Sequence, residues 1–160
     1  MDFVKSHPST VLYVSYSQIS IFKSGLEDPF NDWTDNHVAQ GFSWRKESVS
    51  FKTLSEAGNV LIFIKIEDRI TIYDNCLRAI MVPFELNDSN LAEIASITDS
   101  VEIEIPKGKY SLIFQTGKFE NNEEWCLFSF SRIESKAKIL KADEDITKVD
   151  NLLMEAKPAI

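Results

Sequence analysis

The chain has 160 residues with a formal net charge of −8, and this length fits one domain with a substantial core. Hydrophobic residues make up 44% of the sequence, so we expect a folded chain rather than a disordered one. The negative charge argues against direct nucleic-acid binding, which needs clustered lysine and arginine. It leaves open plain solubility and a basic protein partner.

Nothing in the sequence indicates export or insertion into a membrane. The residues at positions 1–5 lack the basic and apolar regions of a signal peptide. No apolar run approaches the ~20 residues that span a bilayer, so a cytoplasmic location is expected. The two cysteines, Cys76 and Cys126, lie in or beside apolar runs, which predicts buried free thiols and no disulfide.

Alternating or β-rich runs separated by turn residues predict strands through most of the first half. These strands are expected at residues 11–16, 19–22, 44–54 and 60–66. The last two are predicted to form a hairpin, because residues 56–59 have the composition of a turn. Residues 17–18 are predicted to form a bulge or a bend between the first two strands.

A short helix is predicted near residues 35–40, between the second and third strands. Thr34 has the chemistry of an N-cap, Asp35 suits the first turn, and Gly41 fits the left-handed position that ends a helix. His37 is predicted to lie on the helix surface.

So short a helix must be held by tertiary packing. The apolar and aromatic side chains expected to provide it are those of Trp33, Val38 and Phe42.

The second half predicts further strands with less regular connections. These are expected at residues 70–73, 77–86, 101–105, 110–116 and 125–133. Residues 101–105 and 110–116 are predicted to pair across a turn at 106–109, and Pro83 places its strand at an edge or a bulge. Residues 91–97 fit a helical turn or a loop.

About eight strands with short turns and one brief helix indicate an all-β fold, an antiparallel β-sandwich. We expect a single domain over residues 1–160, with the sandwich at residues 11–133. Residues 134–160 form a C-terminal extension that the pattern leaves open between a helix and an edge strand.

The sequence shows no catalytic or metal-binding pattern. His7 and His37 lack metal-ligand spacing, and there is no G-x-S-x-G elbow or phosphate-binding glycine loop. Paired carboxylates occur, and Glu102 and Glu104 share one face of their strand by period two. Such pairs suit a cation or acid–base work, but an exposed acidic face is favoured. We therefore expect no catalytic residue, no metal and no cofactor, and a hydrolase is the least supported function.

Acidic residues gather in two stretches that contain no lysine or arginine. The first stretch, between Lys23 and Arg45, carries Glu27, Asp28, Asp32 and Asp35. The second, between Arg78 and Lys107, carries Glu85, Asp88, Glu93, Asp99, Glu102 and Glu104. If the two stretches share a face, that face has a negative potential suited to the positive cleft of a DNA-binding protein.

Several short motifs recur in a known order over about residues 11–133. They are Ser15-Tyr16 with Gln18, Asp32-Trp33-Thr34-Asp35, Gly41, Ser50-Phe51, Ile62-Phe63, Val82-Pro83-Phe84, and Pro106-Lys107-Gly108 with Tyr110. In this order and spacing the chain resembles the competence protein J family, the DNA-entry nuclease inhibitors. The resemblance implies an immunity-type inhibitor that binds and blocks a cognate DNA endonuclease, a basic and metal-dependent enzyme.

A tryptophan flanked by charges is typical of a binding hot spot. The predicted partner-binding residues are Glu27, Asp28, Asp32, Trp33 and Asp35. The competing interpretation places Trp33 in the core and makes Asp35 a helix-capping residue. The alternative function is a ligand- or carbohydrate-binding module, in which three tryptophans provide stacking surfaces. They are Trp33, Trp44 and Trp125.

Overall fold

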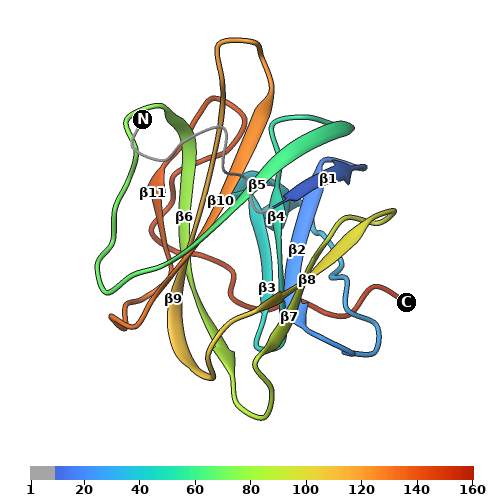
Figure 1. Cartoon of the computed structure of the whole chain (residues 1–160). Helices are drawn as coiled ribbons and strands as arrows, with labels where there is room; N and C mark the ends of the chain where they lie inside the picture. Colours follow the sequence, from blue (N-terminus) through green and yellow to red (C-terminus); the bar gives the residue numbers. More distant parts are fainter. Residues whose placement is uncertain (1–9) are drawn as a thin grey trace.

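The computed structural model describes residues 10–160, which fold into two packed β-sheets and one short helix (Figure 1). The elements are β1 (Thr10–Val14), β2 (Gln18–Lys23), α1 (Asp35–Gln40), β3 (Phe42–Arg45), β4 (Ser48–Lys52), β5 (Gly58–Ile66), β6 (Cys76–Leu86), β7 (Leu91–Ala95), β8 (Ser100–Glu104), β9 (Gly108–Lys118), β10 (Glu124–Ser131) and β11 (Lys138–Lys141). No helix among these residues is both long enough and apolar enough to cross a membrane.

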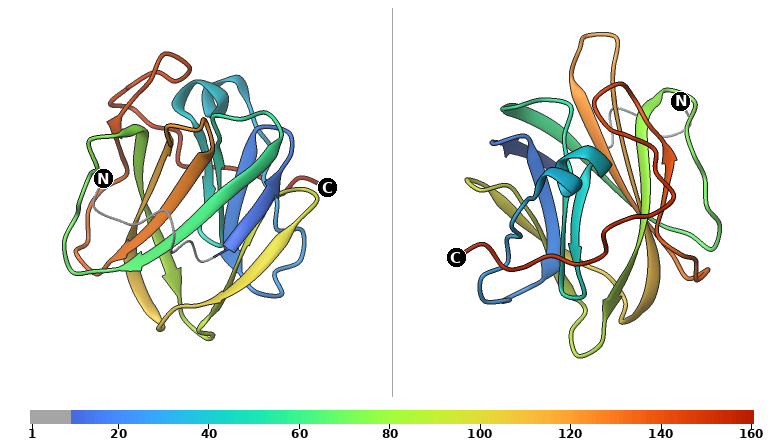
Figure 2. Two further views of the ribbon diagram at one scale, coloured as in Figure 1. Left: turned by 45° about the horizontal axis from the view of Figure 1, so that its top comes forward. Right: turned by 180° about the vertical axis from the view of Figure 1, so that it is seen from behind.

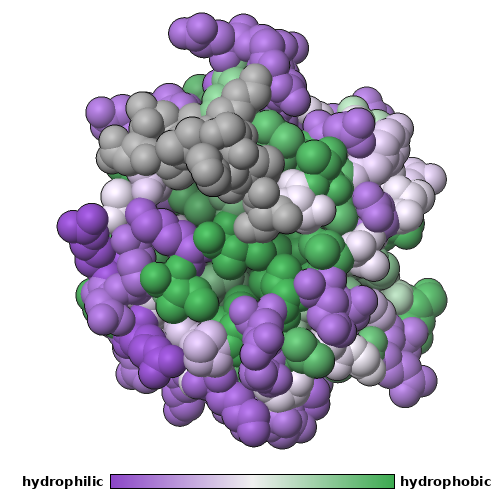
Figure 3. Space-filling model, in the orientation of Figure 1, coloured by the Kyte–Doolittle hydropathy of each residue, from purple (hydrophilic) through white to green (hydrophobic). Residues whose placement is uncertain are grey.

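The strands form a six-stranded sheet A, in the order β1-β5-β10-β9-β6-β11, and a five-stranded sheet B, in the order β3-β4-β2-β7-β8. Neighbouring strands run antiparallel, apart from the parallel pair β5 and β10. The predicted antiparallel β-sandwich is confirmed. On the face drawn in Figure 3, apolar residues occupy the centre around β5 and hydrophilic residues form the margin.

The core between the sheets follows from the period-two alternation of both sheets. Phe51 of sheet B stacks on Phe114 of sheet A, with ring centroids 4.4 Å apart and planes 8° apart. Phe128 meets Phe114 edge to face at 5.3 Å. All three side chains are fully buried, so the two sheets are joined at their centre by packed aromatic rings.

Helix α1 begins and ends where the sequence predicts. The Thr34 hydroxyl accepts a hydrogen bond from the His37 amide, and Gly41 ends the helix at φ 87°. A β-carbon at Gly41 would lie 2.9 Å from the Ile146 side chain, so glycine is required there by both conformation and space. Of the predicted packing residues, Phe42 is fully buried, but Val38 is 43% exposed and does not hold the helix.

The predicted hairpin between residues 44–54 and 60–66 is wrong. That region instead forms the tight β3–β4 hairpin of sheet B, whereas β5 lies in sheet A beside β1 and β10. The crossing between the sheets is held by the buried carboxylate of Glu124, which accepts hydrogen bonds from the amides of Leu54 and Ser55 at 2.9 and 2.8 Å. A bond across some seventy positions of the chain gives no local sequence signal.

Residues 70–73 form no strand, although their alternation predicts one. The Gln115 side chain takes the place of a strand partner: its oxygen accepts from the Tyr73 amide, and its nitrogen donates to the Thr71 carbonyl, both at 2.9 Å. A single side chain therefore satisfies backbone groups that a neighbouring strand would otherwise pair.

The region of residues 91–105 also differs from prediction. Residues 91–95 form strand β7, which pairs with β8, so β8 does not pair with β9 across the turn at 106–109. That turn carries the chain from one sheet to the other. Pro83 is paired with Ser111 of β9, while β11 reaches only Ala79–Met81 on the other side, so the predicted edge placement of Pro83 is correct.

The C-terminal segment contains the edge strand β11 and no helix, so the helical alternative for residues 134–160 is wrong. After β11 the chain crosses the open side of the sandwich to the outer face of sheet B (Figure 2, right). The Ile146 side chain is buried, and the Thr147 amide donates to the Ala39 carbonyl at 2.7 Å. The segment thereby closes the gap between the edge strands β11 and β3.

Both cysteines are free and buried, as predicted. Burial raises the pKa of the Cys76 thiol and raises that of Cys126 well above its usual value. Both thiols are consequently poor nucleophiles in the folded protein.

A buried ion pair fixes the start of the C-terminal segment. The Arg78 guanidinium is fully buried between the sheets and donates to both carboxylate oxygens of Asp143, at 3.0 and 2.9 Å. A third bond, of 2.6 Å, runs to the Lys52 carbonyl. Arg78 thus links β6, β4 and the segment that follows β11.

We predict that Asp143→Ala lowers the free energy of unfolding by about 3–5 kcal/mol, because it leaves the buried Arg78 charge without its anion. Urea denaturation measures this loss. The matched control is Asp145→Ala, an exposed acid two residues on, which should change stability by less than about 0.5 kcal/mol. Equal losses in both variants would contradict this role of the ion pair.

Candidate partner-binding face

The chain between β2 and α1 lies flat on the outer face of sheet B and is held there by Asn31. The Asn31 amide is buried and donates to the carbonyls of Ser43 and Ser48, both at 2.9 Å. Its oxygen accepts from Arg45 Nε at 2.7 Å. One side chain thereby bonds a backbone carbonyl on each strand of the β3–β4 hairpin. We call residues 29–35 the acidic strip.

Other bonds hold the two ends of the acidic strip. The Ser48 hydroxyl donates to the Pro29 carbonyl, and the Ser43 hydroxyl donates to the Asp32 carbonyl at 2.8 Å. The Asp32 amide donates to the backbone carbonyl of Lys157, in the C-terminal segment, at 2.8 Å. The strip is therefore fixed on both sides, by sheet B and by the end of the chain (Figure 2, right).

The five predicted binding residues lie on and just before this strip. Glu27, Asp28, Asp32 and Asp35 are exposed. Trp33 is half-buried, and its indole N–H donates to Gln18 Oε1 at 3.1 Å. Trp33 is thus neither a core residue nor a free stacking platform; it is an anchored ring with one side open.

His37 holds α1 to the C-terminal segment and is buried, so its predicted surface position is wrong. Its Nδ1 accepts from the Thr34 amide at 3.0 Å, and its Nε2 lies 2.9 Å from the Glu155 carbonyl. Because a carbonyl only accepts, Nε2 carries the proton. The position three residues after the N-cap was the available signal, since that side chain reaches back in a capping box.

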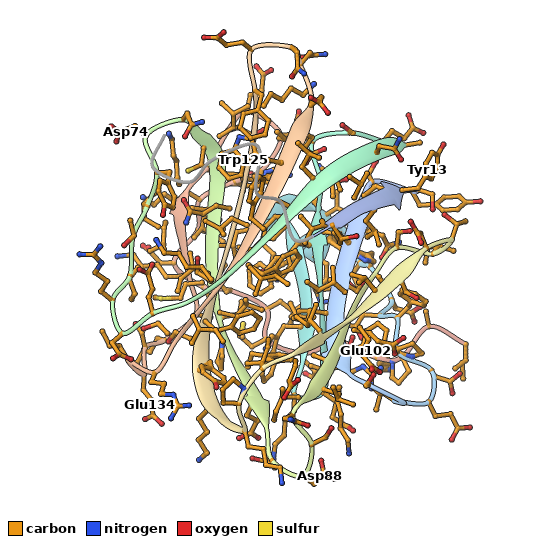
Figure 4. The ribbon with its side chains drawn as sticks, viewed as in Figure 1. Tyr13, Asp74, Asp88, Glu102, Trp125 and Glu134 are labelled. Atoms are coloured by element: carbon orange, nitrogen blue, oxygen red, sulfur yellow. The ribbon has the colours of Figure 1, made fainter. Side chains whose placement is uncertain are left out.

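The two acidic stretches meet on the outer face of sheet B. The Ser24 hydroxyl, at the start of the first stretch, donates to Glu102 Oε2 at 2.6 Å. Lys23 forms a 2.8 Å ion pair with Asp88, and this hydrogen bond lowers the pKa of the Asp88 carboxyl. In Figure 4, Glu102 lies beside the loop that follows β2, whereas Asp74 and Glu134 lie on the sheet A side.

Like charges face one another within this region. Glu93 of β7 stands directly opposite Glu102 of β8 in the antiparallel register, an arrangement that destabilises a sheet. Glu102 and Glu104 are exposed while Val101 and Ile103 turn toward the core, so the predicted shared face of these glutamates is confirmed. The fold does not need this concentration of charge.

Three acids of the second stretch are engaged elsewhere, and one of them is Asp88, which pairs with Lys23. The Asp99 carboxylate accepts from the Tyr13 amide at 2.9 Å and thereby ties β1 to the β7–β8 turn. Glu85 pairs with Lys46 at 3.3 Å. We define the acidic face as the remaining exposed or partly exposed acids on this side: Glu27, Asp28, Asp32, Asp35, Glu93, Glu102 and Glu104.

The tryptophans do not form the stacking surface that a carbohydrate-binding module needs. Trp125 is fully buried. The Trp44 indole N–H donates to the Pro83 carbonyl at 2.8 Å, whereas that of Trp33 donates to Gln18, and the two rings line different hollows. Among residues 10–160 no group of three His, Cys, Asp or Glu side chains is arranged to hold a metal ion.

Three comparisons with known proteins agree with one another. A family model described as Competence protein J (ComJ) matches residues 11–138. A DNA-entry nuclease inhibitor of Bacillus subtilis (strain 168) is 23% identical over 110 residues, which cover 68% of this chain and 81% of that protein. The crystal structure of ComJ from Bacillus subtilis, an inhibitor of the DNA degrading activity of NucA, matches with a TM-score of 0.68 at 22% identity. That match covers 76% of this chain and 92% of the solved one.

We predict that Asn31→Ala lowers the free energy of unfolding by about 2 kcal/mol, because two buried carbonyls lose their donor and Arg45 loses its acceptor. Chemical denaturation measures the loss. Asn36→Ala, which removes an exposed amide from the nearby helix, is the control and should stay within about 0.5 kcal/mol of the parent. A neutral Asn31 variant would contradict the anchoring role given to this side chain.

Proposed function

We propose, from the premise that this chain belongs to the competence protein J family, that it binds and blocks a DNA endonuclease. The Bacillus subtilis relatives are described as an inhibitor of the DNA-entry nuclease and as an inhibitor of the DNA degrading activity of NucA. Those descriptions support a nuclease of the same kind as the partner here. We further propose that this nuclease is metal-dependent and that the inhibitor acts in the cytoplasm.

The observation that carries the proposal is the acidic face on a rigid support. No ion pair within residues 10–160 engages Glu27, Asp28, Asp32 or Asp35. Their charges therefore remain available to a partner. A nuclease must present a positive cleft to the phosphates of DNA, and complementary potentials speed encounter and select the partner.

The surface around β5 fits such a cleft less well. The face drawn in Figure 3 has an apolar centre, and apolar surface gives no attraction to a cationic, DNA-binding groove. We therefore assign binding to the outer face of sheet B rather than to the side on which β5 lies.

The mechanism is competition without chemistry. The acidic face occupies the cationic cleft, and DNA then has no access to the catalytic centre of the nuclease. In this mechanism the chain presents fixed carboxylates and takes part in no chemical step. The bonds of Asn31 and Asp32 hold the strip before the partner arrives, which reduces the entropy lost on binding.

The test uses Asp32→Lys with Asp35→Lys, and measures plasmid degradation by NucA of Bacillus subtilis and by the NucA-type nuclease of the same organism as this chain. The parent protein should suppress degradation at equimolar ratio. The double variant should weaken inhibition by about ten-fold or more, chiefly through a slower association that also loses its salt dependence.

The matched control is Asp74→Lys with Glu134→Lys, which makes the same change in net charge on the sheet A side (Figure 4). It should inhibit nearly as well as the parent. If the parent slows neither nuclease at large molar excess, the proposed function is wrong. If both double variants lose inhibition equally, total charge matters and the acidic face has no special role.

A further inference from the structure

The turn between β1 and β2 holds two residues in a conformation that they do not favour. Tyr16 and Ser17 have φ of 58° and 57°, and Ser15 and Gln18 form a bridge across them. Positive φ at both central positions defines a type I′ turn, for which Asn-Gly is the preferred pair. A tyrosine there costs conformational energy, of the kind that is retained at functional sites.

The surrounding backbone holds this turn in place. The Ser17 amide donates to the Glu56 carbonyl, and the Ser17 carbonyl accepts from the Thr53 amide, both at 2.9 Å. These bonds involve only backbone groups, so they do not require tyrosine or serine at these positions. The Tyr16 side chain, meanwhile, is 73% exposed, so burial does not explain its presence.

Tyr16 stands at the wall of a groove of about 360 Å³ that reaches the acidic strip. The groove is lined by Tyr16, Ser17, Gln18, Trp33, Val38 and Lys52. Gln18 fixes the indole through its N–H, and the Val38 side chain is 43% exposed on the side of α1 that packing leaves open. Two aromatic rings and one aliphatic side chain thus surround one opening.

The charge around the groove specifies what it can take. Asp32 and Asp35 flank Trp33 in the chain and are exposed, as is Glu56 beside the strained turn. Lys52 is the one cation among the described lining residues, and its ammonium donates to the Asp145 carbonyl at 3.1 Å. The ammonium is therefore held toward the C-terminal segment, and the Lys52 stem contributes apolar wall.

We propose, as an extension that rests on the proposed function, that this groove is the hot spot of the interface and takes an arginine or lysine side chain of the nuclease. A cation over the faces of tyrosine and tryptophan is attracted by the ring quadrupoles. The aliphatic stem of that side chain packs against Val38, and the carboxylates at the rim pair with its charge. Tyrosine, tryptophan and arginine are the residues that dominate hot spots.

The discriminating variant is Tyr16→Asn with Ser17→Gly, which installs the preferred type I′ pair without altering net charge. It should raise the melting temperature or leave it unchanged, because the strain is removed. It should at the same time raise the dissociation constant for NucA, or for the NucA-type nuclease of the same organism, by about ten-fold or more. Calorimetry measures stability, and a kinetic binding assay measures affinity.

The loss should appear as faster dissociation with an unchanged association rate, because the steering charges remain. Ile70→Asn is the control: it also replaces an exposed apolar side chain, 37% exposed, but lies in the segment that follows β5. It should bind like the parent.

The outcomes separate the two proposals. If the parent protein inhibits and the double variant binds equally well, the proposed role of the groove is wrong and that of the acidic face is unaffected. A parent protein that does not inhibit overturns both. If the double variant unfolds, Tyr16→Ala alone takes its place, and unchanged affinity in that variant again overturns the groove.

Discussion

The buried amide of Asn31 is the constraint on which the exposed chemistry depends. It bonds the carbonyls of Ser43 and Ser48 and accepts from Arg45, so the chain between β2 and α1 lies flat on sheet B. Without those bonds the Asp32 carboxylate, on the segment that leads into α1, would lose part of its support. With them, it stands at a fixed position on a sheet that is itself packed through Phe51 and Phe114. In the proposed mechanism, this rigid placement helps the exposed charge to compete with DNA for the cleft of the nuclease.

The C-terminal segment completes the same construction from the other side. Asp143 is tied to the buried Arg78, the Glu155 carbonyl meets His37, and Lys157 accepts from the Asp32 amide. This segment lies beyond the family match, which ends at residue 138. The support of the motif around Trp33 therefore comes partly from residues outside the matched region. The acidic face accepts unfavourable contacts, such as Glu93 opposite Glu102, because the scaffold beneath it is stable without them.

Local signals in the sequence were sufficient for local structure. Thr34 and Gly41 gave both ends of α1, and alternation gave most strands, because caps and periodicity act within a few residues. The pairing of the strands could not be predicted from local signals. The Glu124 carboxylate and the Gln115 side chain decide where residues 53–57 and 70–73 go, and both act across long distances in the chain. No spacing rule shows such bonds.

The candidate site divides in the same way. The charges were visible as two base-free stretches, but their meeting on one face follows from β2 and β7 being neighbours, which the sequence does not reveal. The strained Tyr16 was hidden for a related reason, since a type I′ turn is not expected at Tyr-Ser.

The measurement that tests the account most directly is hydroxyl-radical footprinting of side chains in the free protein and in its complex with NucA. The account predicts protection of Tyr16 and Trp33, with Ile72 and Leu77 unprotected; protection confined to Ile72 and Leu77 would contradict it.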